Sequence, residues 1–176
     1  MREMQYAYHK KFFHGLYFFL VLVIACLLWD SPISLALIPF LVISAGTQSC
    51  FYLHFVDFAR IHARFVEQRL NKILGKDTLI GSEIEDLYFY PIDAPKVGGF
   101  VLSRPLRFFS FFTLHWIVLW LGLAAFALWR LLPMMGSCGC SYLALLVFWG
   151  GLNLAYLFWF FGKGQDLISI QTFLKK

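Results

Sequence analysis

Charged residues are scarce in this chain of 176 residues. Asp, Glu, Lys and Arg make up 14% of the sequence, whereas hydrophobic residues make up 60% and aromatic residues 20%. Soluble domains carry about 25% charged and roughly 45–50% apolar residues. The composition therefore excludes an ordinary soluble domain and predicts that much of the apolar surface faces lipid.

The familiar motifs of soluble enzymes are also missing. The sequence has no Gly-x-x-x-x-Gly-Lys-Ser/Thr, no His-Glu-x-x-His and no Gly-x-Ser-x-Gly, which mark phosphate-binding loops, zinc proteases and serine hydrolases. It also has no Gly/Ser-rich linker, low-complexity tract or clear internal repeat. We therefore expect a single membrane domain over residues 1–176, and we assign no catalytic residues, no cofactor and no metal.

Long apolar segments are present instead. Four of them cover residues 12–29, 33–53, 108–129 and 142–161. Each approaches the roughly 20 residues that an α-helix needs to cross a hydrocarbon core of about 30 Å. The first is long for a signal peptide and lacks a cleavage site after it, so we expect it to be retained. The sequence predicts an all-α integral membrane protein with four transmembrane helices.

Basic residues are distributed unevenly between the two sides of these segments. If the N-terminus is cytoplasmic, Arg130 is the only one of the 15 Lys and Arg residues on the outer side. This bias follows the positive-inside rule. We expect a multi-pass plasma (inner) membrane protein with both termini and the connection 75–107 in the cytoplasm. The net charge of +5 then faces anionic membrane lipids, and no nucleic acid is needed to explain it.

The second apolar segment continues into a polar stretch without a Pro or Gly before Gly75. We expect one helix over residues 33–74 that extends into the cytoplasm. Polar residues spaced three and four apart fall on one side of it: Asp57, Arg60, Arg64, Glu67 and Asn71. Apolar residues predicted to form its packing face are Phe55, Phe58, Phe65, Leu70 and Ile73.

Two interpretations of this polar stripe are open. Its charges can pair with one another, in water or within the molecule. Alternatively, copies of the helix surround an axis and the stripe lines a wet vestibule. The second interpretation predicts a homo-oligomer that forms or gates a conduit, or perturbs the membrane. We expect this function first; the alternative is a non-catalytic accessory or assembly subunit of a larger membrane complex, docked through this helix and residues 87–90.

A possible polar cluster lies near the inner membrane boundary. His54, Asp57 and His115 are imidazole and carboxylate groups at a depth where such groups are often functional. They could bind a metal or relay a proton, which would make the chain a membrane enzyme. Their spacing fits no metal motif, so we expect interfacial hydrogen-bonding groups instead.

The other candidate features are smaller. Cys26, Cys138 and Cys140 lie near the outer side, either as a disulfide or as free thiols, with 138 and 140 in an outer loop over residues 133–141. Polar residues inside the apolar segments, including Thr47 and Asn153, either join helices or line a pore. Ser82 and Glu85 have the spacing of a capping box, which predicts a short helix in the connection.

Overall fold

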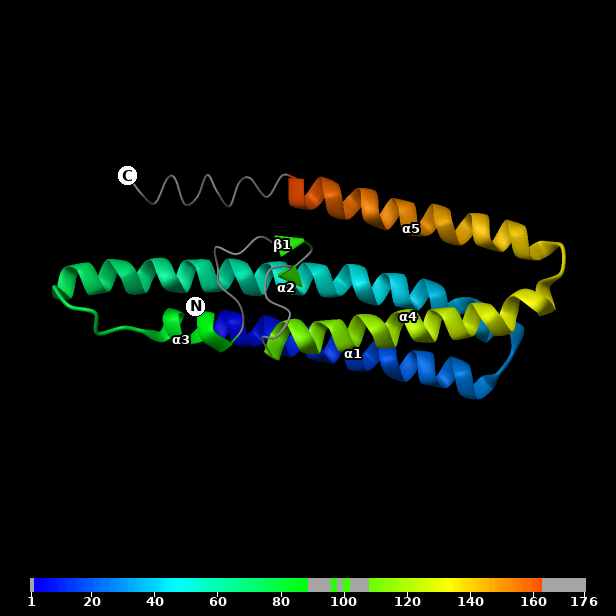
Figure 1. The fold of residues 1–176 in the computed structure, drawn as a ribbon, viewed down its shortest axis with the longest axis horizontal. Helices are drawn as coiled ribbons and strands as arrows, with labels where there is room; N and C mark the ends of the chain where they lie inside the picture. Colours follow the sequence, from blue (N-terminus) through cyan, green and yellow to red (C-terminus); the bar gives the residue numbers. More distant parts are fainter. Residues whose placement is uncertain (1, 89–95, 98–99, 102–107, 163–176) are drawn as a thin grey trace. The chain divides into compact units, whose positions relative to one another are not determined.

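The computed structural model describes residues 2–88, 96–97, 100–101 and 108–162 of the chain (Figure 1). Its elements in chain order are α1 (Arg2–Trp29), α2 (Pro32–Leu74), α3 (Gly81–Tyr88), β1 (Lys96–Val97), β2 (Phe100–Val101), α4 (Phe108–Met135) and α5 (Cys138–Gly162). The two short strands pair antiparallel, with Lys96 opposite Val101. Apart from these strands, the described elements are all helical.

The prediction of four long apolar helices is confirmed. α1, α2, α4 and α5 each contain a stretch that is long and apolar enough to cross a membrane. The prediction that the second helix continues through residue 74 is also confirmed, because α2 is one helix of 43 residues. The short helix expected at Ser82 and Glu85 is α3.

Two boundaries differ from the prediction. α1 begins at Arg2 instead of residue 12, since its polar first turns continue the same helix. The loop expected over residues 133–141 is reduced to Gly136 and Ser137 between α4 and α5. Pro133 removes one backbone donor but does not end α4. The helix ends where Gly136 adopts a φ of 52°, a left-handed conformation that glycine reaches without steric cost.

The chain divides into two compact units. One contains residues 1–14 and 50–118, and the other contains residues 15–49 and 119–176.

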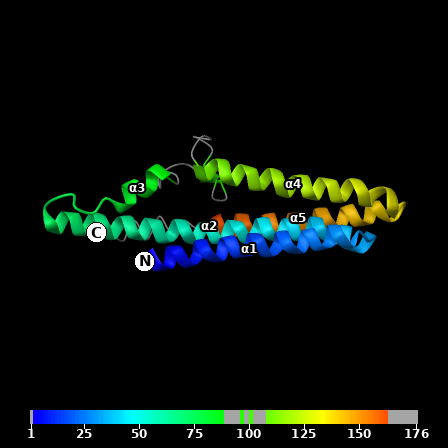
Figure 2. The same ribbon diagram turned by 90° about the horizontal axis from the view of Figure 1, so that it is seen from below.

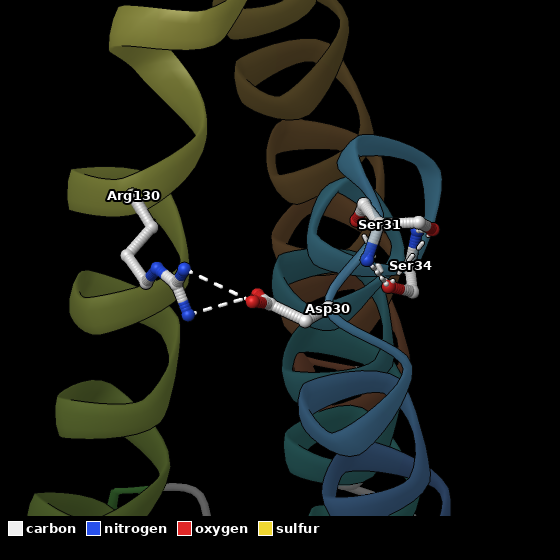
Figure 3. Close-up of polar contacts among 4 residues, drawn as sticks. All are labelled: Asp30, Ser31, Ser34 and Arg130. Carbon is white, nitrogen blue, oxygen red and sulfur yellow. Dashed lines mark hydrogen bonds and ion pairs between the residues drawn. The ribbon is translucent and has the colours of Figure 1, made fainter.

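In the second unit, a tight turn joins α1 to α2. Asp30 lies in this turn with a φ of 49°, a conformation that Asp tolerates better than most residues. The Ser31 N–H donates to Ser34 Oγ at 2.9 Å, and the Ser34 N–H donates to Ser31 Oγ at 3.1 Å, which satisfies backbone donors at the start of α2. Arg130 of α4 faces the Asp30 carboxylate with two nitrogens, at 2.8 and 3.1 Å (Figure 3).

Polar contacts also connect α2 to α5 in this unit. The Tyr142 hydroxyl donates to the Ala36 carbonyl at 2.9 Å, and the Thr47 hydroxyl lies 3.0 Å from Asn153 Oδ1. Between them, the Phe40 ring meets the Tyr142 ring edge to face, with centroids 6.0 Å apart. Thr47 and Asn153 thus join two helices, which is one of the two roles expected of them from the sequence.

Candidate functional site

The first unit contains a group of charged residues that its helices cover. Arg60 is 1% exposed and Asp57 is 8% exposed, which is unusual for charged side chains. Arg60 NH1 lies 3.7 Å from Asp57 Oδ1, and Arg60 Nε lies 3.8 Å from Glu85 Oε2. Gln5 Nε2 donates a hydrogen bond to the same Glu85 oxygen at 3.3 Å. We call these four residues, from α1, α2 and α3, the charge cluster.

The charge cluster explains how α3 is held. A buried guanidinium costs several kcal/mol unless opposite charges surround it, and here one carboxylate comes from its own helix and the other from α3. Tyr8 of α1 stacks on Phe55 of α2 with ring centroids 5.0 Å apart. The first turns of α1 lie beside α2 in both views (Figures 1 and 2). The polar side of α2 is therefore the side on which α3 packs.

Beyond Arg60, the same polar side of α2 faces a groove. The groove has a volume of about 460 Å³. Its lining residues come from the last turns of α2, the following turn and α3: Arg64, Glu67, Gln68, Asn71, Lys72, Gly75, Lys76, Asp77, Leu79 and Glu83. Three residues of the predicted polar stripe are among them. The stripe is thus one continuous surface, covered at Asp57 and Arg60 and open from Arg64 to Asn71.

Asn71 has a structural role at the end of this groove. Its Oδ1 atom accepts hydrogen bonds from the Thr78 N–H at 3.2 Å and from the Leu79 N–H at 2.9 Å. Its Nδ2 atom donates to the Leu79 carbonyl at 2.8 Å. Gly75 ends α2 with a φ of 66°, so the chain turns back at once. The amide of Asn71 therefore fixes the turn that brings α3 toward α2.

The apolar residues assigned to the packing face are partly exposed in the single chain, and their packing in an assembly stays a prediction. Ile73 is 75% exposed, Leu70 is 41% exposed and Phe55 is 36% exposed, while Phe58 and Phe65 are half-buried. The buried apolar residues of this part of α2 are Leu53, Val56 and Ala59. Spacing alone could not choose the buried side, because α3 offers Arg60 a charged partner, Glu85, that the sequence pattern does not reveal.

The residues of the possible polar cluster have separate surroundings. Asp57 belongs to the charge cluster, His54 is half-buried beside the Phe55 ring at 5.9 Å, and His115 is exposed. Within the part of the chain that the structure describes, no group of three His, Cys, Asp or Glu residues is arranged to hold a metal ion.

The sequence left open whether Cys26, Cys138 and Cys140 form a disulfide. In the structure they are free thiols. Cys138 and Cys140 are exposed in the first turn of α5, and Cys26 and Cys50 are half-buried. Residues 87–90, named above as part of a docking patch, lie outside the described side chains.

Sequence reasoning missed Gln5 and the second role of Glu85. Glu85 carries a signal for helix capping, and that signal located α3, but it does not indicate an ion pair with Arg60. Gln5 carries no signal, because its contact with Glu85 spans 80 positions of sequence.

No protein family model matches the chain, and neither a curated protein nor a solved structure is detectably similar to it. Its class is defined by its own structure: a helical protein with four helices apolar enough to cross a membrane. One of these helices carries a polar, partly covered extension, which we call the arm: residues 60–74 of α2, the turn 75–80 and α3.

Proposed function

We propose that this chain is a multi-pass membrane protein that serves as a non-catalytic assembly subunit of a larger membrane complex, with the arm as its docking element. Membrane insertion of α1, α2, α4 and α5 is supported by their exposed apolar side chains. Leu28 is 81% exposed, Val147 is 73% exposed and Phe158 is 75% exposed. In water such side chains would favour aggregation, whereas in a bilayer they contact acyl chains.

The proposed orientation has both termini and the arm on the cytoplasmic side. The support is the positive-inside bias, with Arg130 as the single basic residue on the other side. At 1.5 Å per residue the 43 residues of α2 extend roughly 65 Å. This length is about twice the hydrocarbon core, so the last turns of α2 stand clear of the lipid.

The burial of Arg60 is the single observation that favours the assembly role over the conduit. A helix that lines a vestibule needs its charged side open to water. Here Asp57 and Arg60 are covered, and their charges are matched by Glu85 of the same chain. The arm also leaves three apolar residues of α2 exposed, Val66, Leu70 and Ile73. Exposed apolar residues on a helix outside the membrane favour protein contacts.

The mass of the particle extracted from its native membrane in a mild detergent tests this function. We expect a complex of this chain with a second polypeptide in fixed ratio, and we expect Leu70→Glu to release the chain as a lighter particle. The matched variant Leu28→Glu changes an exposed leucine of α1 that is far from the arm in sequence, and its detergent-soluble fraction should keep the second polypeptide. A particle that contains this chain alone and conducts ions in bilayers would establish the conduit instead.

The free thiols give a direct test of the orientation. In a Cys26→Ser/Cys50→Ser background, a membrane-impermeant maleimide should label Cys138 and Cys140 in sealed cells, because both are exposed. In a further background with all four cysteines replaced by Ser, a cysteine introduced by Lys76→Cys should react only after the cells are opened. The reverse pattern would overturn the orientation.

A further inference from the structure

One lysine of α1 lies against an aromatic stack that joins two helices. Lys11 Nζ lies 5.5 Å from the centroid of the Tyr8 ring, which is within the range of a cation–π contact. The Tyr8 ring stacks on Phe55 of α2, with centroids 5.0 Å apart and ring planes inclined by 17°. The ammonium group of Lys11 is therefore held beside a stack to which both helices contribute.

The depth of this stack follows from the apolar segments on either side of it. Tyr8 comes four residues before Phe12, where the first apolar segment begins. Phe55 comes two residues after Leu53, where the second segment ends. At 1.5 Å per residue, these offsets are about 6 and 3 Å, and the headgroup region on one side of a bilayer is about 5–8 Å thick. In a bilayer that these segments cross, both helices place the stack among the headgroups, where tyrosine rings are enriched.

A second polar group follows Lys11 on the same side of α1. His14 is three positions further along, and residues three apart are neighbours on a helix, with about 5–6 Å between their Cβ atoms. Both side chains are exposed. Among the residues that the structure describes, no carboxylate pairs with Lys11 and no group accepts a hydrogen bond from the His14 ring. Both groups are therefore available to a ligand at the edge of the lipid.

The donors of Lys11 and His14 suit a phosphate group. The ammonium group supplies a positive charge and three N–H donors, and the imidazole ring supplies an N–H in either protonation state. Hydrogen bonds from a cation to phosphate oxygens are among the stronger ones in proteins. A phosphate has several acceptor oxygens, so one group can meet both side chains. At headgroup depth, the phosphate within reach is that of a phospholipid.

The charges around these residues favour a headgroup with a net negative charge. Lys10 is also exposed, and within the described part of the chain it has no carboxylate partner. The Asp57 carboxylate, two residues after Phe55, faces Arg60. Basic residues at a membrane surface attract anionic lipids. A zwitterionic headgroup would bring a cation of its own close to the two lysines, whereas an anionic headgroup brings none.

We propose that Tyr8, Lys11 and His14 form a binding site for the phosphate group of an anionic phospholipid. The Tyr8 ring positions the Lys11 ammonium group, and Lys11 and His14 donate hydrogen bonds to the phosphate oxygens. This inference rests on the proposed membrane insertion of α1 and α2, and it is independent of the assembly role.

Native mass spectrometry of the full chain tests this site. The protein, freed of lipid in detergent, is titrated with phosphatidylglycerol and, separately, with phosphatidylcholine that carries the same acyl chains. The first phosphatidylglycerol should bind at least about tenfold more tightly than the first phosphatidylcholine. Inorganic phosphate at the same concentration should not displace it, because free phosphate lacks the acyl-chain contacts of the lipid.

Paired variants separate an ordered site from net charge. Lys11→Gln should weaken phosphatidylglycerol binding at least about tenfold. Lys10→Gln removes the same charge from a side chain that has no ring contact in the described structure, and it should weaken binding by no more than about threefold. Tyr8→Leu should weaken binding severalfold because the cation–π contact is lost, whereas Tyr8→Phe keeps the ring and should bind as the parent does. His14→Leu should also weaken binding severalfold, and an unchanged melting temperature shows that each variant is folded.

Equal affinity for the two lipids, or equal losses in Lys10→Gln and Lys11→Gln, would reduce the site to a general attraction between charges and overturn the inference. Binding that inorganic phosphate abolishes, or that His14→Leu leaves unchanged, would also overturn it. The proposed membrane role fails separately: a chain that alkaline carbonate releases from its native membrane does not span the bilayer. A chain that resists carbonate but shows no lipid preference removes only the lipid site.

Discussion

Arg60 of α2 is held between Asp57 of its own helix and Glu85 of α3, at 3.7 and 3.8 Å. The guanidinium is 1% exposed, so its charge faces these carboxylates and meets almost no water. Glu85 also accepts a hydrogen bond from Gln5 of α1. Glu85 therefore links α3 to both α1 and α2. The shape of the arm depends on the pairing between Glu85 and Arg60.

Arg60→Met is expected to destabilise the first unit. The variant keeps the apolar part of the side chain but removes the guanidinium that faces Asp57 and Glu85. Breaking a buried pair in this way costs about 3–5 kcal/mol, and we expect the lower end because the Glu85 side chain is 21% exposed. Thermal unfolding in detergent measures the loss. Hydrogen exchange should locate it in residues 81–88 and the first turns of α1.

A double variant separates the ion pair from general packing. Glu85→Gln alone should cost about 1 kcal/mol, since the amide oxygen of the new side chain still accepts a hydrogen bond from Gln5. Because Arg60 and Glu85 are in one network, Arg60→Met/Glu85→Gln should cost less than the two single changes added together. Strict additivity would mean that the two side chains do not interact.

Asn71→Ala is expected to release the turn after α2 while α2 itself stays folded. Three hydrogen bonds to the backbone of Thr78 and Leu79 are lost. These bonds are exposed, so the expected cost is about 1–2 kcal/mol in total. Hydrogen exchange should speed up at the amides of both residues. Gln68→Ala, one turn earlier on the same groove wall, should change stability by less than about 0.5 kcal/mol, and equal effects of the two variants would contradict the role of Asn71.

The sequence was sufficient to predict the four long helices, but it was not sufficient to predict which side of α2 is buried. Apolar length alone located all four long helices, and the absence of Pro and Gly between His54 and Gly75 correctly extended α2 to Leu74. The polar stripe was also recognised correctly as one side of one helix. The burial of the stripe at Arg60 was not predictable, because a charged residue is expected to be solvent-exposed unless its partners are known. Its partner Glu85, and Gln5 that donates a hydrogen bond to Glu85, lie far away in the sequence and meet only in the fold.

The ion pair between Asp30 and Arg130 is expected to contribute little to the free energy of unfolding. Its contribution should fall as the salt concentration rises. Arg130 is 34% exposed and Asp30 is 46% exposed, and exposed pairs contribute about 0.2–1 kcal/mol. Arg130→Gln should lower the melting temperature slightly at low salt and match the parent at 1 M salt, where charges are screened within about 3 Å.

Asp30 also carries a backbone requirement, which a second pair of variants isolates. Asp30→Asn keeps a side chain that tolerates the φ of 49° and loses only the charge. Asp30→Val adds a β-branched side chain in a left-handed conformation and should cost at least about 1 kcal/mol more. If both variants have the same stability, the strained turn is not held as the structure describes.

Arg64→Glu distinguishes the assembly role from a conduit. Arg64 is the first residue of the stripe that the charge cluster leaves on the open groove wall. If the chain is an assembly subunit, the purified protein should pass no steady current in planar bilayers, and the charge reversal should leave this unchanged. If copies of the arm enclose a vestibule, Arg64 contributes to its potential, and anions should lose permeability relative to cations on reversal. That shift should shrink at high salt, because the screening length is about 10 Å at 0.1 M and about 3 Å at 1 M. A steady current with this selectivity change and this salt dependence would replace the assembly role with the conduit.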